Sequence, residues 1–561
     1  MQIRVLLLCG AASLATTSPA VAADNPTFLA GLAAMPTTLP AQHIAATVES
    51  KAAAVELPIV RPGKRTVRHA ARLARVEAPA VRTVAAGPDS SQADLERKVA
   101  EQQGQLEALV AKVSALQTAA APAAPKPEKS EKPDAPSWSF ANARPTIASA
   151  DGRFSLAVRA LGQFDTAYYM QGGKSEQLAA ANGPDLSSGQ NFRRVQLGIQ
   201  GKAFGDWSYQ FNYDFGGSGG TESPGRIQAV WIGYDGFAPF SFRIGAFPAS
   251  AGLEDNTAAS DTLFLERNAP ADLARNIAGG DGRDAISVIY AGERVYGAFS
   301  YTGNKIADAG SFDEQQALLG RLSGLVYSSD TAKLVVSGNG TYVFKVADTT
   351  AGPNAQGSFS LGTTPELTVD NTGAKLANTG ALNARQVAQW GIETGAQWKS
   401  LYGQAGYFGF AVEERGPAAP TVNFGGWYAQ ASWVLTGETR GYSASSGSFG
   451  SPKPVQPFAL DGSGWGAFEL AARYSDLDLN DKAGVAGAAL PAGGVRGGDQ
   501  RIMTLGLNWY PNSVVRFELQ AQNIQVSRLG TVPAGFGHGV LNNAGAGQAF
   551  DTLALRSQFS L

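Results

Sequence analysis

The stretch Trp207-Ser208-Tyr209-Gln210-Phe211-Asn212-Tyr213-Asp214-Phe215 alternates an aromatic residue with a polar one at every step. Successive side chains of a strand point to opposite faces, so this stretch predicts a strand with one apolar face and one polar face. The same alternation recurs at residues 154–165, 389–398 and 515–522 and again in the last nine residues. Segments of about ten such residues, separated by Gly, Asp, Asn, Ser and Pro turns, are typical of a transmembrane β-barrel.

About sixteen such segments can be counted from Trp138 onward. They lie near residues 154, 193, 207, 227, 240, 285, 294, 317, 333, 388, 402, 424, 465, 501, 514 and 553. An even number is expected of a bacterial single-chain barrel, and about sixteen strands enclose an aqueous channel. The fold class is therefore predicted to be all-β, a transmembrane antiparallel barrel over residues 138–561. A soluble β-sandwich would not combine so many aromatic residues on one face with so many Gln, Asn, Ser and Arg on the other.

The residues before the barrel divide into four segments. Residues 1–22 have a signal peptide's pattern: Arg4, an apolar run, and Ala20-Val21-Ala22 as the cleavage site, which predicts export. Residues 23–90 are Ala/Pro-rich and are predicted to be disordered. Residues 91–118 are predicted to form a short coiled coil, and residues 119–137 a Pro/Ala/Lys linker. The apolar seam of that coiled coil is formed by Leu95, Val99, Gln102, Leu106, Leu109, Val113 and Leu116. An isolated amphipathic helix remains the alternative, because the seam covers only about three heptads.

Composition excludes several classes of function. The chain has 45 Lys and Arg against 47 Asp and Glu, so net charge gives no case for nucleic-acid binding. Its three histidines and single cysteine cannot build a Cys/His zinc site. The run from Gly216 to Gly220 fits the pattern of a catalytic serine, but a loop containing Pro224 follows it instead of a helix. We expect no enzyme activity, no metal and no cofactor.

The barrel segment resembles the phosphate-selective porin O and P family of Gram-negative outer membranes. The similar motifs include Phe192-Arg193-Arg194-Val195-Gln196-Leu197-Gly198, Phe204-Gly205-Asp206-Trp207, Thr262-Leu263-Phe264-Leu265-Glu266-Arg267 and Leu507-Asn508-Trp509-Tyr510-Pro511. The resemblance implies a homotrimeric sixteen-stranded porin of the bacterial outer membrane that contacts its lipid and conducts small anions such as phosphate. One motif departs from the family: Gly245-Ala246-Phe247-Pro248 stands where family members have Gly-Gln-Phe-Lys. A polar residue and a cation are therefore missing beside the expected constriction.

If the apolar positions face lipid, the alternate positions line the pore. By this parity ten cations point inward and are predicted to contact anions: Arg159, Arg194, Lys202, Arg243, Arg294, Arg321, Lys333, Arg473, Arg516 and Arg556. Guanidinium groups keep their charge and offer oxyanions a fork of donors. The alternative is that these arginines pair with inward carboxylates and brace the wall.

The segment 247–284 is a long early connection and is predicted to fold into the channel as a constriction loop. Its charged residues of interest are Glu254, Asp261, Glu266, Arg267, Arg275 and Arg283. The other long connections, near 345–387, 437–463, 476–500 and 526–550, are rich in Gly, Pro, Ser and Thr and are predicted to be extracellular loops.

The sequence thus predicts an outer-membrane porin that passes small hydrophilic solutes by diffusion and prefers anions such as phosphate. Two alternatives remain open at this stage. The barrel could be a general diffusion porin with weak selectivity. Alternatively, the chain could be a structural tether whose coiled coil contacts cell-wall material.

Overall fold

The computed structural model describes residues 90–119, 135–171, 186–217, 225–306, 308, 313–351, 355–370, 372–416, 419–485, 488–529 and 547–561. The predicted signal peptide, the disordered segment and most of the linker lie outside these residues. The chain forms two units, residues 1–121 and 122–561. In the first unit, helix α4 (Ser90–Ala119) covers the predicted heptad segment. No helix in these described ranges combines the length and apolarity needed to cross a membrane.

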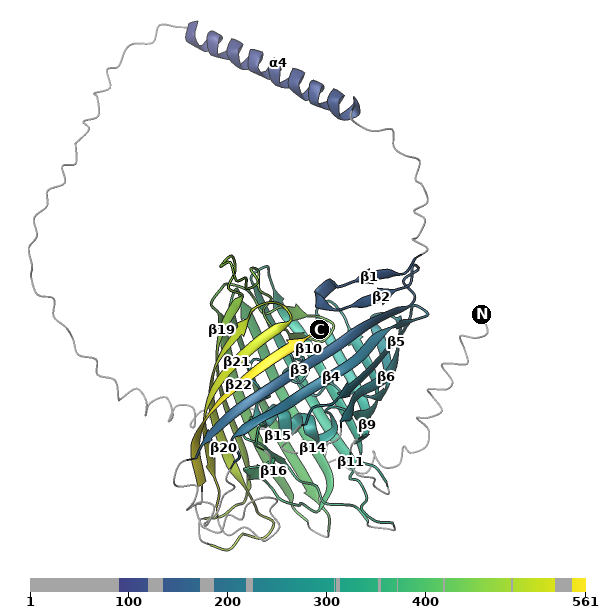
Figure 1. Ribbon diagram of the computed structural model, residues 1–561, viewed down its shortest axis with the longest axis vertical. Coiled ribbons are helices and arrows are strands. Elements are labelled where there is room, and N and C mark those ends of the chain that lie inside the picture. The colour runs from purple at the N-terminus through teal and green to yellow at the C-terminus, as the bar shows by residue number, and fades with distance from the viewer. Residues whose placement is uncertain are drawn as a thin grey trace, which may run out of the picture. The chain divides into compact units, whose positions relative to one another are not determined.

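The second unit is an antiparallel barrel of sixteen long strands among the described residues (Figure 1). Each of the sixteen sequence segments coincides with one of these strands. The strands are β3 (Ser155–Met170), β4 (Gly189–Ala203), β5 (Trp207–Asp214), β6 (Arg226–Phe237), β7 (Phe240–Ala246), β8 (Arg283–Ala291), β9 (Val295–Lys305), β10 (Gln316–Ser328), β11 (Ala332–Lys345), β14 (Ala384–Trp398), β15 (Leu401–Glu414), β16 (Thr421–Val434), β19 (Ala467–Asp481), β20 (Val495–Tyr510), β21 (Val515–Ser527) and β22 (Gly547–Ser560).

The sheet closes between its last and first long strands. β22 pairs with β3 in antiparallel register from Asp551 opposite Met170 to Ser560 opposite Leu161. Closure leaves no unpaired edge, which is the condition for a sheet to cross the hydrocarbon of a bilayer. A short hairpin of β1 (Ser137–Ser139) and β2 (Thr146–Ala148), joined by the 3-10 turn Ala141–Ala143, extends the start of β3. This hairpin lies at the same end of the barrel as the C-terminus (Figure 1).

Alternation along the strands sorts the side chains as the sequence predicted. Outward apolar residues are exposed, for example Leu197 at 53% and Leu322 at 64%. Inward polar residues such as Gln163 and Thr504 are buried. A barrel in water would not leave such residues exposed, whereas a bilayer covers them and stabilises the fold.

The two ends of the barrel differ in the lengths of their connections. At one end β4–β5, β6–β7, β8–β9, β10–β11, β14–β15 and β20–β21 are joined by short turns. Outer-membrane barrels turn this end toward the periplasm. The segment 435–466, which joins β16 to β19, also starts at this end, since Val434 N donates to Ser400 O of the β14–β15 turn (2.9 Å). The prediction that 437–463 is an extracellular loop is therefore wrong. Composition alone could not tell which end a connection leaves, because that depends on the strand count before it.

A charge added to the lipid-facing side of the wall should destabilise the barrel much more than one added to the lumen side. Leu322 lies midway along β10 and faces outward, so Leu322→Arg places a cation in the hydrocarbon and should cost about 2–4 kcal/mol. Gln210 of β5 lines the internal cavity, so Gln210→Arg should cost much less. Urea unfolding of the two variants in lipid vesicles measures the difference. Equal losses would mean that the two faces are assigned wrongly.

Candidate functional site: the lumen of the barrel

The constriction loop, residues 247–282 between β7 and β8, crosses the inside of the barrel to the opposite wall. Its backbone meets wall amides there: Asn508 Nδ2 donates to Leu263 O (3.0 Å), and Gln558 Nε2 donates to Ser260 O (3.0 Å). Leu265 N donates to Gln520 Oε1 (3.1 Å). The prediction that this segment enters the channel agrees with these contacts, although the loop ends at 282. Arg283 and Asp284 belong to β8, so Arg283 is not a loop residue.

Helix α6 (Ala269–Ala278) lies within this loop, and local interactions at both of its ends explain why it forms there. Asn268 caps its first turn by accepting a hydrogen bond from Ala271 N (2.9 Å), and Pro270 suits the first turn. At the other end, Arg283 Nε donates to Gly279 O (3.0 Å) just beyond the last turn. The helix buries Leu273 and Ile277 in an apolar cluster with inward residues of the wall. This packing fills one side of the lumen and fixes the loop.

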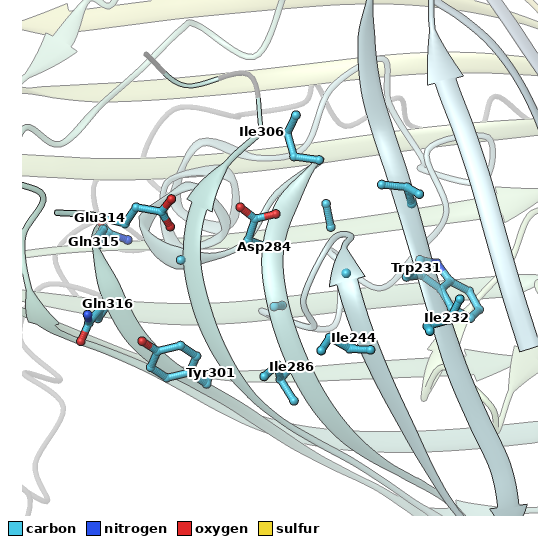
Figure 2. A pocket seen from close by; sticks show the side chains of 15 residues that line it. Trp231, Ile232, Ile244, Asp284, Ile286, Tyr301, Ile306, Glu314, Gln315 and Gln316 are labelled. Carbon is cyan, nitrogen blue, oxygen red and sulfur yellow. The ribbon is translucent and has the colours of Figure 1, made fainter. Parts of the chain in front are cut away.

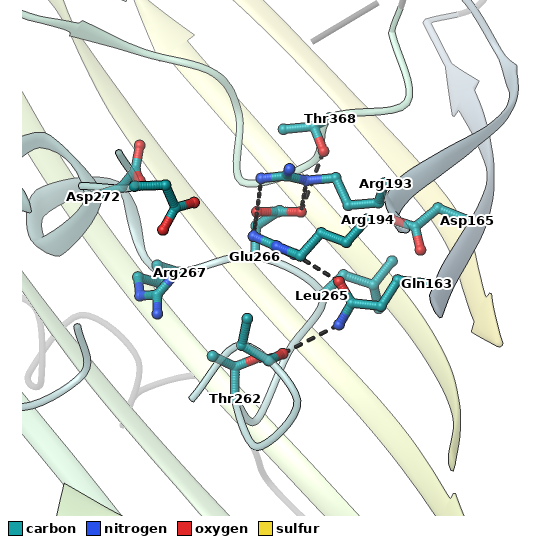
Figure 3. Close-up of polar contacts among 12 residues, drawn as sticks. Gln163, Asp165, Arg193, Arg194, Thr262, Leu265, Glu266, Arg267, Asp272 and Thr368 are labelled. Atoms are coloured by element: carbon teal, nitrogen blue, oxygen red, sulfur yellow. Dashed lines mark hydrogen bonds and ion pairs between the residues drawn. The ribbon is translucent and has the colours of Figure 1, made fainter. Parts of the chain in front are cut away.

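The carboxylate of Glu266 anchors the middle of the constriction loop (Figure 3). Arg193 donates two hydrogen bonds to this carboxylate (2.6 and 3.0 Å). The guanidinium nitrogens of Arg556 and Arg194 lie 3.2 and 3.9 Å from its oxygens. Thr368 adds a hydrogen bond of 3.2 Å. Burial alone would raise the pKa of Glu266, but the three guanidinium groups outweigh burial and hold that pKa well below its usual range. Glu266 therefore stays ionised and binds the loop to β4, to β22 and to the segment that contains Thr368.

Four of the predicted anion contacts are bracing residues instead. Arg556 forms a bidentate pair with Asp165 (2.6 Å for each bond), and Arg473 pairs with Glu366. Arg516 pairs with Glu518 (3.1 Å), and Arg321 donates to Ser446 O and Gly447 O (2.9 and 2.6 Å). All four side chains point inward as predicted, yet inward loops cover them and leave each residue at most 3% exposed. They cannot meet a passing solute in this arrangement, which corrects their assignment as pore-lining contacts.

Two further segments enter the lumen and were not predicted to do so. The segment 346–383 between β11 and β14 contains the pair β12 (Gly362–Thr363) and β13 (Ala377–Asn378), and supplies Glu366 and Thr368 to the anchors above. The segment 435–466 contains β17 (Tyr442–Ser443) and β18 (Ser448–Phe449) and enters from the turn end. Asn256 Nδ2 of the constriction loop donates to Ser446 O (2.9 Å), so loops from opposite ends of the barrel meet.

Arg440 holds the segment 435–466 in place. Its guanidinium forms two hydrogen bonds with Glu469 of β19 (2.7 and 3.0 Å) and donates to Asp261 O (3.0 Å). Gly447 has φ +56°, and a Cβ there would lie 2.8 Å from Tyr296 Cβ. Only glycine allows both this conformation and this close approach to the wall. The Gly-rich character that suggested an exposed loop thus serves tight packing inside the barrel.

The open part of the lumen is a cavity of about 710 Å³ between the constriction loop and the wall from β3 to β9. Three of the predicted wall arginines line it: Arg159, Arg194 and Arg243. Arg159 donates to the neutral Gln200 (2.6 Å), and Arg194 donates to Gln163 (2.7 Å). Among the described residues neither Arg159 nor Arg243 forms an ion pair, so both present uncompensated charge to the cavity.

The remaining predicted wall cations lie near the turn end. Lys202 is exposed close to the end of β4, and Lys333 is partly buried at the start of β11. Arg294 is exposed in the turn between β8 and β9, so it is outside the strands and its parity assignment is wrong. Parity cannot be extended through a turn whose length is unknown.

The charged residues of the constriction loop largely have partners, several of them within the loop itself. Arg275 bridges Asp255 (2.6 Å) and Asp281 (2.7 Å), and Arg267 lies 3.9 Å from Asp255. Burial alone would raise the pKa of Asp281, but Arg275 and its neighbouring arginines lower it below its usual range. Asp261 accepts a hydrogen bond from Ser451 (2.6 Å), and Glu254 is buried 3.8 Å from Arg473. The loop's acidic residues thus oppose the wall arginines less than their number suggests.

Sequence parity did not identify Arg193 or Arg144 as inward arginines. Arg193 reaches the lumen beside Arg194 because the β3–β4 register shifts between Gln163 and Phe164, a bulge that alternation cannot reveal. Arg144 precedes β2 and lines the cavity near Arg159, although no alternating pattern marked its position. The Arg193-Arg194 dipeptide itself was the available signal for a bulge, since two adjacent charges cannot both avoid lipid on a regular strand.

A second hollow, of about 630 Å³, lies over β6 to β10 and is not part of the channel (Figure 2). Lipid-facing Ile232, Ile244 and Ile286, all more than half exposed, line it together with Asp284 and Glu314. Trp231 borders both this hollow and the internal cavity. Within the described residues no group of three or more His, Cys, Asp or Glu could hold a metal ion.

The bracing role of Arg556 can be tested by stability. Arg556→Met leaves Asp165 buried without its partner and should cost about 3–5 kcal/mol, whereas the double variant Arg556→Met with Asp165→Leu should recover most of that loss. Arg159→Met is the matched control, because its described partner is a neutral amide. Urea unfolding midpoints compare the three. If Arg556→Met unfolds at the same urea concentration as Arg159→Met, the bracing assignment is wrong.

Known proteins are similar to this chain in sequence or in fold. Porin O of Pseudomonas aeruginosa is 26% identical over 334 residues, which are 58% of this chain and 74% of Porin O. Two solved structures resemble the barrel more distantly: the trimer form of OmpT from Vibrio cholerae (TM-score 0.42, 9% identity, 73% of this chain and 99% of that one) and an anion-selective porin from Comamonas acidovorans (TM-score 0.40, 13% identity, 72% of this chain and 100% of that one).

The model of one protein family matches most of the barrel. It is described as phosphate-selective porin O and P, and it covers residues 174–534, more than half of the chain. The match spans the constriction loop, both other inward segments and the strands from β4 to β21. The chain therefore belongs to the phosphate-selective porin O and P family and is an outer-membrane β-barrel channel rather than an enzyme.

Proposed function

We propose that this porin passes small hydrophilic solutes by diffusion and favours anions. The observation that supports the preference is the unequal pairing of charge around the cavity. On the wall, Arg159 and Arg243 have no carboxylate partner among the described residues, whereas Asp255 and Asp281 of the facing loop share Arg275. In a narrow aqueous space such fixed charges are incompletely screened and raise the local concentration of anions.

Phosphate is the anion that the family's description suggests, and it is a proposal for this chain. In favour of it, Arg194 and Arg159 lie on one side of the cavity with Arg144 nearby. Against strict selectivity, Ala246 and Pro248 supply neither an amide nor a cation beside the constriction. Because Asp255, Asp261 and Asp281 also line the cavity, a weakly selective general diffusion porin remains the second candidate.

The chain is further proposed to assemble as a homotrimer, with α4 as a three-stranded bundle. The proposal is supported by the family resemblance and by the exposed apolar residues of α4: Leu106 and Leu109 are 69% and 67% exposed in the single chain. A helix of this length gains little stability alone, but three copies tethered to one trimer would have a high effective concentration.

Anion preference is tested by the reversal potential in a potassium chloride gradient. The wild type should reverse on the anion-selective side, and Arg159→Glu should shift the reversal potential toward cation selectivity, since it changes the local charge by two units. Lys399→Glu is the control: it makes the same charge change in the exposed turn between β14 and β15. A non-selective wild type, or equal shifts in the two variants, would favour the general diffusion porin.

The trimer is tested by a disulfide at Leu106. The only natural cysteine, Cys9, lies in the predicted signal peptide, so Leu106→Cys should add the one thiol of the mature chain. In a parallel bundle this seam position brings copies together, and oxidation should yield a dimer band in denaturing gels. Glu107→Cys, next to the seam, should crosslink far less. Equal crosslinking at both positions would indicate random collision rather than a bundle.

A further inference from the structure

Arg243 occupies an unusual position in the cavity. It is the only charged residue among the cavity-lining positions that β6 to β9 provide within the described chain. Its neighbours on this part of the wall are uncharged: most are apolar residues or small hydroxyl residues, including Trp231, Ser241, Ser287, Ile289, Ala298 and Ser300, and the others are Gln228 and Tyr296. The adjoining wall of β3 to β5 differs, because it carries two arginines together with Gln196, Gln210 and Asn212. The cavity thus has a polar side and an apolar side with a single cation.

Aromatic rings hold the guanidinium of Arg243 in place. Its Cζ lies 4.0 Å from the centroid of Trp231 and 5.2 Å from that of Phe247. No hydrogen bond or ion pair to a described residue uses its N–H groups. Contacts with aromatic rings stabilise the positive charge and orient the plane of the guanidinium group, but they leave its N–H donors available. Arg243 is therefore a fixed fork of donors that opens into the cavity.

The surroundings of Arg243 favour a carboxylate over inorganic phosphate. A carboxylate presents two oxygens, which one guanidinium can satisfy with two parallel hydrogen bonds. Inorganic phosphate carries up to two charges and more oxygens, so one cation on an apolar wall leaves much of its lost hydration uncompensated. The facing loop contributes Pro248, Ala258 and Ala259 to the same cavity, and these residues can cover an apolar group.

We propose that Arg243, with Trp231 and Phe247, forms a binding subsite for small organic monocarboxylates that carry an apolar or aromatic body. The subsite rests on the proposed function, because a solute reaches it only through an open, anion-admitting channel. Carboxylate oxygens bind the guanidinium fork, while the apolar body lies against the side of the cavity that lacks other charges. The binding is moderate, so the solute can leave as well as enter.

The experiment is block of chloride current through single channels in planar bilayers by benzoate, acetate and inorganic phosphate. Benzoate should halve the current at a lower concentration than acetate, which lacks the apolar body, and than phosphate. Arg243→Gln should raise the half-blocking concentration of benzoate about tenfold or more, because a charge-assisted pair contributes a factor of that size. Arg243→Lys keeps the charge but loses the fork, so it should weaken benzoate block with little change in reversal potential.

Lys399→Gln removes one exposed positive charge outside the cavity and is the control, with benzoate block as in the wild type. The subsite is overturned if phosphate blocks at lower concentration than benzoate, or if Arg243→Gln and Arg243→Lys both leave benzoate block unaltered. Failure of the proposed function has a different signature. A channel without anion preference in which benzoate block still depends on Arg243 contradicts the proposed function and keeps the subsite.

Discussion

The buried carboxylate of Glu266 is the contact on which the interior of this barrel depends. A sixteen-stranded barrel without inward loops would be a wide aqueous pore. Arg193 of β4 and Arg556 of β22 bind Glu266. They hold the middle of the constriction loop against the wall, beside the pairing of β22 with β3 that closes the barrel. Once the loop is fixed there, α6 covers the inner faces of several strands from β11 to β19. What remains open is one side of the lumen.

Fixing the loop divides the inward arginines into two sets. Those on the covered side, such as Arg473 and Arg516, pair with carboxylates and donate to backbone carbonyls, and they stabilise the arrangement of the loops. Those on the open side, such as Arg159 and Arg243, have no carboxylate partner among the described residues and give the cavity its positive character. Inward arginines thus either brace the loops or give the cavity its positive charge. The placement of the loops, and not the parity of the strand position, decides which role an arginine has.

Alternation along the chain was enough to predict the barrel, because lipid exposure imposes the same period of two on every strand. All sixteen strands were located, as was the entry of the constriction loop between β7 and β8. The covered and open sides could not be separated in this way, since the burial of Arg321 depends on Ser446, which is 125 residues away. Nor could parity find Arg193, whose inward direction comes from a bulge in the pairing of β3 with β4. The end from which 435–466 departs was missed because it was judged from composition, whereas the number of preceding strands decides it. Its inward packing was missed because a glycine-rich segment has the same composition whether it is exposed or packed inside.

The division of the lumen into an open and a covered side is the central claim, and thiol accessibility tests it most directly. Arg243→Cys places a thiol on the open side, and Gln520→Cys places one behind the constriction loop, where Gln520 is 1% exposed. With the predicted signal peptide removed, neither variant contains another cysteine. A membrane-impermeant anionic thiol reagent added to open channels should modify Arg243→Cys rapidly and change its chloride current, and should leave Gln520→Cys unmodified. Equal rates of modification at the two positions would contradict the account, because they would show that the constriction loop does not cover the far wall.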